Sequence, residues 1–121
     1  MPPPVFELTF HRARSTVTLK VWDLEDGKEV RTLVGHTNDV NGVVVTADGR
    51  HVVSVSHDRT LKVWDLSTGQ ALATLETHAP LQCCAATLDG TLIAGDSMGA
   101  VHILDWVHTE RLVRGKPSPA G

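Results

Sequence analysis

The sequence predicts an all-β protein built from repeated units of four antiparallel strands. The first indication is a repeat, because Leu-Lys-Val-Trp-Asp-Leu occupies both residues 19–24 and residues 61–66, which are 42 residues apart. The second is a two-residue alternation of apolar and polar side chains in segments rich in Val, Ile, Leu and Thr, separated by turn-forming pairs such as Asp-Gly. The sequence shows no helical periodicity.

The turn pairs and the alternation together locate the strands of each unit. One complete unit is expected to have strands near 40–46, 51–56, 60–66 and 71–76. The next unit is expected to have strands near 81–87, 91–95, 100–105 and 108–113. Before these, a first unit has expected strands near 18–24 and 28–34, and residues 5–10 could add a third.

The repeat weakens toward both ends of the chain. Residues 101–105 follow 40 residues after the second copy and keep its alternation and its final Asp, but Leu104 replaces the Trp. The first 15 residues match the repeat poorly, and residues 116–121 contain Pro and Gly and are expected to fray. The expected parts are a divergent N-terminal segment (1–15), a partial first unit (16–35), a complete unit (36–77), a degenerate third unit (78–114) and a flexible tail (115–121).

The composition argues against two classes of partner. The chain has 121 residues, with 11 Lys and Arg against 14 Asp and Glu and a net charge of -3, so it lacks the basic field that holds a phosphate backbone. No apolar run approaches the roughly 20 residues needed to span a bilayer, and the N-terminus does not resemble a signal peptide. We therefore expect a cytoplasmic protein that binds neither nucleic acid nor a membrane.

The cysteines and histidines do not form a metal-binding motif. Cys83 and Cys84 are adjacent in a segment that alternates like a strand, so their side chains should point to opposite faces and a bridge between them would be strained. We interpret them as reduced packing residues, with a redox or arsenical-type sensor as the alternative. The seven histidines include no His-x-x-x-His pair, and we expect neither a metal nor another cofactor.

Residues 35–65 carry four features in a fixed order. A Gly-His pair opens this stretch, an Asp-Gly hairpin follows, a Ser-x-Asp-x-Thr turn occupies residues 56–60, and Trp-Asp closes it. From Leu19 onward the chain resembles the WD-repeat β-propeller family, and the resemblance implies a partial β-propeller of about 2.75 four-stranded antiparallel blades. The stretch looks most like the C-terminal propellers of bacterial nucleotide-switch signalling proteins, although the chain has no Gly-rich phosphate loop.

The second unit contains every residue type of a nucleophilic triad, in Ser54, His36 and Asp58. The family resemblance implies another role, in which His36, Ser54, Asp58 and Trp64 form one buried structural hydrogen-bonded tetrad, with Ser56 as the alternative hydroxyl. We favour the structural role because a catalytic serine needs an exposed oxygen beside an oxyanion site, and nothing in the sequence indicates one.

The tetrad pattern is incomplete in the outer units. In the third unit His78 persists, but Ala94, Met98 and Leu104 stand where Ser54, Asp58 and Trp64 would be. His78 is therefore expected to be exposed or bonded to the backbone, with apolar packing in place of the polar network. The first unit keeps Trp22 and Asp23 but has Thr16 at the Asp position.

The resemblance also implies a binding surface, because family members commonly use the loops on one flat face to hold peptides or domains. Position by position, this face would consist of Asp39, Asn41, His57, Leu81, Cys83 and Ser97. The mixture of polar residues with two apolar ones suits a protein patch with a small apolar centre. The alternative is that these are ordinary loop residues with no partner.

About three blades are too few to close a ring, since propellers typically have four to eight blades. We expect self-association, in which two copies form a six-bladed ring, or a partner that completes the ring, or a longer parent chain. The expected function is a non-catalytic protein-protein interaction scaffold that binds other proteins or peptides. The alternative is a regulatory or sensor propeller segment of a larger nucleotide-binding signalling protein, and an enzyme is the least favoured class.

Overall fold

Three antiparallel sheets make up the computed structural model, which describes residues 6–13, 16–107 and 111–114, with side chains in 17–106 and 112–113. The first sheet consists of β1 (Phe6–Ala13), β2 (Thr16–Asp23) and β3 (Glu29–Val34). The second consists of β4 (Val40–Val45), β5 (His51–Ser56), β6 (Thr60–Asp65) and β7 (Ala71–Glu76). The third consists of β8 (Leu81–Ala86), β9 (Thr91–Asp96), β10 (Val101–Val107) and β11 (Arg111–Arg114).

The prediction of successive antiparallel units is confirmed, and the strands of the second sheet begin and end within one residue of their expected positions. The optional third strand of the first sheet is present, but it spans Phe6–Ala13 and pairs with β2 along its whole length. The strand expected at 108–113 falls partly outside the described residues, and its described part is β11.

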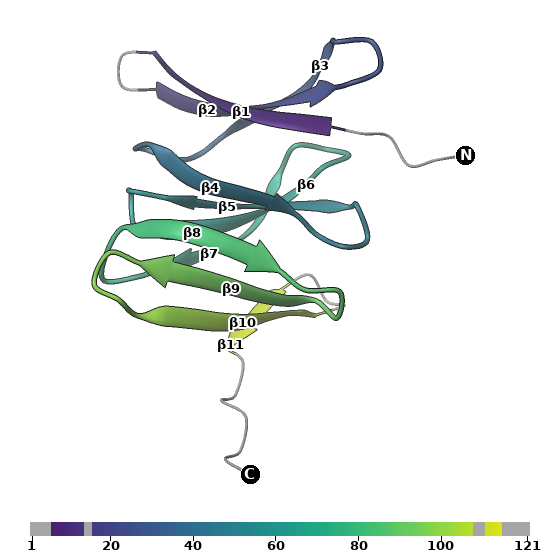
Figure 1. Ribbon diagram of the computed structural model, residues 1–121. Helices are drawn as coiled ribbons and strands as arrows, with labels where there is room; N and C mark the ends of the chain where they lie inside the picture. The colour runs from purple at the N-terminus through teal and green to yellow at the C-terminus, as the bar shows by residue number, and fades with distance from the viewer. Residues whose placement is uncertain (1–5, 14–15, 108–110, 115–121) are drawn as a thin grey trace.

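The sheets stack face to face in chain order, with the second sheet between the other two (Figure 1). The buried core between the first and second sheets consists of Val17, Leu19, Val21, Leu33, Val40, Val52, Trp64 and Leu66. The buried core between the second and third consists of Val53, Val55, Leu61, Val63, Leu81, Leu92, Ala94 and Leu104. All six residues of β5 are buried, because alternate side chains of this strand enter the two cores.

The second and third sheets are fixed to each other through their first strands, β4 and β8, which lie side by side (Figure 1). A Cβ on Gly42 would lie 3.0 Å from Cγ2 of Val55 and 3.4 Å from the Cα of Cys83, so the glycine permits this close approach. Beside it, Nδ2 of Asn41 donates a hydrogen bond to the carbonyl of Leu81 at 2.9 Å.

Matching β-bulges show which residues of β4 and β8 are equivalent. In the second sheet the register shifts between Val40 and Gly42, and in the third it shifts between Leu81 and Cys83. Each bulge leaves one extra residue unpaired, which is Asn41 in β4 and Gln82 in β8. Leu81 is therefore the structural counterpart of Val40, and Cys83 is the counterpart of Gly42.

The core between the second and third sheets can be tested with a matched pair of leucines. Leu92 is 1% exposed within this core, whereas Leu88 is 93% exposed in the turn before β9. We expect Leu92→Ala to lower the free energy of unfolding by about 2–5 kcal/mol, because it removes buried methyl groups and leaves a cavity. We expect Leu88→Ala to change it by less than about 0.5 kcal/mol. Urea unfolding at equilibrium measures both, and equal losses would contradict the assigned core.

Candidate functional site

The structure brings together all four residues of the expected tetrad in one chain of hydrogen bonds. Nε1 of Trp64 donates to Oγ of Ser54 at 2.8 Å. The same oxygen lies 2.6 Å from Nε2 of His36, and Nδ1 of His36 lies 2.9 Å from Oδ2 of Asp58. His36 lies in the loop before β4, Ser54 in β5, Asp58 in the turn after β5 and Trp64 in β6. The hydrogen bonds therefore join parts of the second sheet that are far apart in sequence.

The direction of donation in this chain follows from the neutral form of His36. With its proton on Nδ1, the ring donates to Asp58 and accepts the Ser54 hydroxyl proton at Nε2, while the indole N–H of Trp64 donates to the Ser54 oxygen. Every donor then has an acceptor, as buried polar groups require. Burial is the largest influence on the ring and lowers the pKa of His36 below its ordinary value, although the hydrogen bond with Asp58 opposes this effect.

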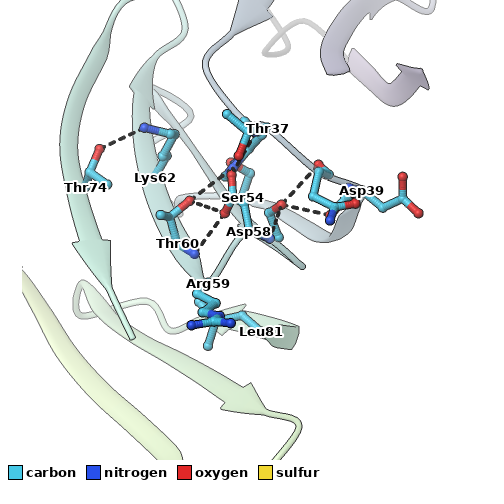
Figure 2. Close-up of polar contacts among 12 residues, drawn as sticks. Thr37, Asp39, Ser54, Asp58, Arg59, Thr60, Lys62, Thr74 and Leu81 are labelled. Atoms are coloured by element: carbon cyan, nitrogen blue, oxygen red, sulfur yellow. Dashed lines mark hydrogen bonds and ion pairs between the residues drawn. The ribbon is translucent and has the colours of Figure 1, made fainter. Parts of the chain in front are cut away.

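Asp58 connects the tetrad to the backbone at both ends of the site. Its carboxylate accepts hydrogen bonds from the backbone N–H of Thr37 at 3.0 Å and from the N–H and hydroxyl of Thr60 at 2.9 and 2.5 Å. Figure 2 shows Thr37, Thr60 and Ser54 arranged around it. Burial is the largest influence and opposes ionisation, but the hydrogen bonds from Thr60, Thr37 and His36 together hold the pKa of Asp58 below its ordinary value.

Ser56, the alternative hydroxyl, does not join the tetrad. Its hydroxyl donates to the carbonyl of Asp39 at 2.8 Å, and its oxygen accepts the backbone N–H of Asp58 at 3.1 Å. The backbone N–H of His57 also donates to the carbonyl of Asp39 at 2.9 Å. These bonds tie the turn between β5 and β6 to the start of β4, so that the turn is held in one position.

Ser54, His36 and Asp58 are connected in the same order as the members of a hydrolytic triad, with the serine on Nε2 and the carboxylate on Nδ1. However, Ser54 is fully buried and its oxygen already accepts the indole proton of Trp64. A substrate carbonyl cannot approach this oxygen without displacing the indole. The geometry therefore supports a structural role for the network.

The third sheet uses a different polar pair, which the sequence interpretation missed. Ala94 and Leu104 are buried in the core, and His78 is exposed. Nε2 of His102 lies 3.0 Å from Oδ2 of Asp96, and Oδ1 of Asp96 accepts the backbone N–H groups of residues 98 and 100. The hydrogen bond with His102 is the largest influence that lowers the pKa of Asp96 below its ordinary value.

A sequence signal for this pair was present. In the alternation of β9 and β10, residues 94, 96, 102 and 104 share one face, which places Asp96 and His102 at the positions of Ser56 and Lys62 in the second sheet. Asp96 and His102 lie outside the tetrad positions, which by themselves reveal only the replacement of Ser, Asp and Trp by Ala94, Met98 and Leu104.

Most of the predicted binding residues lie at one end of the second and third sheets, but Leu81 and Cys83 were wrongly assigned to it. Leu81 is fully buried in the core, and the Cys83 side chain lies over Gly95 on the sheet face. The physical reason is a loop shorter by one residue, since three residues lie between His36 and Val40 but only two lie between His78 and Leu81. A slip of one residue turns a strand side chain to the opposite face.

We call the corrected surface the entry rim. It lies where β4 and β8 begin and where the turns after β5 and β9 reverse the chain. Its members are Asp39, Asn41, His57, Gln82, Ser97 and Met98. Asp39 is half-buried and the other five are exposed, with Met98 at 82%. The backbone N–H of Ser97 donates to the carbonyl of Pro80 at 2.9 Å, which repeats the bond between His57 and Asp39.

The two cysteines are free thiols in different environments. Cys83 is exposed, whereas Cys84 is half-buried beside the core between the second and third sheets. Burial, followed by the neighbouring Cys83, raises the pKa of Cys84 to about 11, so this thiol stays protonated at neutral pH. Among the described residues, no three His, Cys, Asp or Glu side chains group as metal ligands do. The described part of the chain also contains no helix with the length and apolarity to cross a membrane.

Comparison with known proteins gives one family and several partial relatives. The family model described as the TEP-1 C-terminal β-propeller matches residues 36–106, which is more than half of the chain. The nuclear distribution protein PAC1 of Ajellomyces capsulatus is 49% identical over 43 residues, covering 36% of this chain and 9% of that protein. Human nucleoporin Nup37 is 37% identical over 59 residues, covering 48% of this chain and 18% of Nup37. The matched region is therefore a small part of each of these curated relatives.

A solved structure shows the fold over nearly the whole chain. The β-propeller domain of Cps50 (Swd1) from Myceliophteria thermophila superposes with a TM-score of 0.69 at 21% identity, covering 89% of this chain and 37% of that one. The expected partial β-propeller is confirmed by this likeness.

The structural role of the tetrad can be tested by removing its central hydroxyl. We expect Ser54→Ala to lower the free energy of unfolding by about 1–3 kcal/mol, because Trp64 Nε1 and His36 Nε2 both lose a buried hydrogen-bond partner. Ser97→Ala, at an exposed serine of the entry rim, serves as the control and should change stability by less than about 0.5 kcal/mol. Thermal and urea unfolding compare the two variants, and an unchanged stability of Ser54→Ala would refute the structural role.

The lowered pKa of His36 predicts a dependence of stability on pH. The unfolded chain binds a proton at His36 near its ordinary pKa of about 6.5, while the folded chain binds it only at lower pH. The contribution of His36 is thus complete above about pH 6.5 and is lost as the pH falls toward the lower folded pKa. His36→Gln should remove this part of the pH dependence. An NMR titration measures the folded value directly, and a His36 pKa at or above 6.5 would contradict the buried neutral ring.

Proposed function

Because the chain belongs to the WD-repeat β-propeller family, through the TEP-1 C-terminal β-propeller model that it matches, we propose that it is a non-catalytic segment of a protein-interaction scaffold. The observation that carries the proposal is the entry rim, where two adjacent sheets expose side chains on turns that are held by hydrogen bonds. Such a preordered surface loses little conformational entropy when a partner binds.

The chemistry of the entry rim suits a protein or peptide ligand. Asn41, His57, Gln82 and Ser97 offer exposed hydrogen-bonding groups, and Met98 offers a flexible apolar side chain beside them. Protein interfaces commonly combine a polar periphery with an apolar anchor of this kind. The apolar centre that the sequence interpretation assigned to Leu81 and Cys83 is thus supplied by Met98.

The buried position of Ser54 supports the non-catalytic part of the proposal, since the one triad-like arrangement of the described residues has no room for a substrate. A cytoplasmic location and protein partners remain parts of this proposal. The alternative of a sensor segment in a nucleotide-binding signalling protein gains no support from the geometry or from the relatives described above.

The binding surface can be located by site-specific photo-crosslinking. A benzophenone amino acid at position 57 places the probe on the entry rim, and the same probe at Gln70 places it in the turn between β6 and β7, at the opposite end of the sheet. We expect protein crosslinks from position 57 and not from position 70, identified by mass spectrometry. With the purified partner, Met98→Ala should weaken binding about tenfold, and Gln70→Ala should leave it unchanged.

Two results would argue against this function. Crosslinks from position 70 alone would place the binding surface elsewhere. Hydrolase activity that disappears in a correctly folded Ser54→Ala variant would replace the scaffold with an enzyme.

A further inference from the structure

A cleft lies between the second and third sheets, at the end of the strands opposite the entry rim. It opens between two hairpin turns, one from β4 to β5 and the other from β8 to β9. Both turns carry Thr, Asp and Gly in the same register, at residues 46–49 and 87–90. The cavity has a volume of about 580 Å³, which is within the range of pockets that hold ligands. We call it the hairpin cleft.

An aromatic pair lines the hairpin cleft. The rings of His51 and Trp106 meet edge to face, with their centroids 5.1 Å apart. His51 is the first residue of β5 and Trp106 lies in β10, so the pair joins the second sheet to the third. His51 is buried, whereas Trp106 is half-buried. The part of the Trp106 side chain that remains accessible can therefore contact a molecule in the cleft.

The two hairpins bring carboxylates to the edge of the cleft. Asp48 and Asp89 are both exposed, and each holds its own turn through Oδ1. This oxygen accepts the backbone N–H of Arg50 at 2.9 Å in one turn and that of Thr91 at 3.2 Å in the other. Asp105 adds a third carboxylate, and among the described residues that line the cleft Arg50 is the one permanent cation. The lining is therefore negatively charged overall.

Hydrogen bonds within the turns keep these carboxylates ionised. The hydroxyl of Thr87 donates to Asp89 and is the largest influence that lowers the pKa of Asp89 below its ordinary value. Burial is the largest influence on Asp48 and opposes ionisation, but the hydrogen bonds from Thr46 and Arg50 hold the pKa of Asp48 below its ordinary value. Both side chains thus carry a negative charge at neutral pH.

This combination of charge and apolar surface suits a lysine or arginine side chain. Such a side chain lays its methylene stem along apolar surface and keeps its charged head in a polar environment. Leu88, which is 93% exposed, and Ala47 offer apolar surface on the two hairpins. The ring face of a tryptophan also attracts a cation. We propose that the hairpin cleft binds a basic peptide segment of a partner, with a lysine or arginine side chain held between the two hairpins.

This site goes beyond the scaffold function proposed above, because it is separate from the entry rim. Strands β4 and β8 run from the rim to the cleft, and each has six residues. At about 3.3 Å per residue, the two surfaces are roughly 20 Å apart, so both can be occupied together. Gln70 lies at the same end as the cleft but beside the first sheet, since a Cβ on neighbouring Gly69 would lie 3.5 Å from Cδ of Arg31. Gln70 does not line the cleft.

An NMR titration of the 121-residue chain tests the proposal, with a blocked peptide of alternating arginine and alanine as the probe. We expect the indole N–H signal of Trp106 to shift and reach saturation. The indole signal of Trp64 should stay in place, because Trp64 donates to Ser54 in the core between the first and second sheets. The same peptide with glutamate in place of arginine should shift neither signal, because it repels the carboxylates of the cleft.

A pair of matched variants locates the charges that bind the peptide. Asp89→Asn removes the charge and keeps the oxygen that holds the turn, so we expect the peptide to bind about fivefold more weakly. Asp26→Asn is the control, because Oδ1 of Asp26 accepts the N–H of Lys28 at 2.9 Å in a similar turn that does not line the cleft. It should leave the affinity unchanged. Thermal unfolding checks that both variants are folded.

Three outcomes would overturn the proposal. The first is that the arginine peptide gives no saturable shift of Trp106, and the second is that the glutamate peptide shifts it equally. The third is an equal loss of affinity in Asp26→Asn and Asp89→Asn, which would assign the attraction to the overall charge of the chain. Crosslinking from position 57 tests the entry rim independently, so a failure at the cleft and a failure of the scaffold function are distinguishable.

Discussion

The hydrogen-bonded chain from Trp64 to Asp58 is the interaction on which the second sheet and its entry rim depend. Trp64 places an indole in the core between the first two sheets, and its one polar atom must find an acceptor there. Ser54 provides it, and His36 passes the connection on to Asp58, which binds the backbone at the start of β6. The indole, which is buried in the sheet core, is thereby linked to the turn that presents His57 at the surface.

The third sheet shows that this connection can be made in a second way. Leu104 occupies the position of Trp64 and carries no polar atom, so no serine is needed at position 94 and an alanine fills the space. Asp96 then takes over the turn between β9 and β10 by accepting two backbone N–H groups, and His102 pairs with it. In both sheets a carboxylate closes the turn at the entry rim, but the polar network extends into the core only where a tryptophan requires it.

The sequence was sufficient for the strands because their period and their turn pairs repeat, and one face of each strand is apolar. The sequence was insufficient where a loop is shorter by one residue, because this shift turns the side chains of the following strand to the opposite face. The shortened loop between His78 and Leu81 moved two predicted binding residues into the core and onto the sheet face. The Asp96–His102 pair was missed for a different reason. Alignment of the internal repeats shows where a tetrad residue is replaced, but it does not show that two other residues have become partners across a hairpin.

The stack also has a direction that the repeat alone does not reveal. Lys20 and Glu29 form an ion pair on the outward side of the first sheet, whereas Val101 and Ile103 lie exposed on the outward side of the third, at the positions that Leu19 and Val21 occupy in the core of the first. An ion pair in water costs nothing to leave exposed, whereas Val101 and Ile103 gain free energy from any apolar cover, at about 25 cal/mol for each Å² removed from water. The entry rim is perpendicular to the outward side of the third sheet, at the strand ends, so covering that side and binding a partner at the rim do not compete.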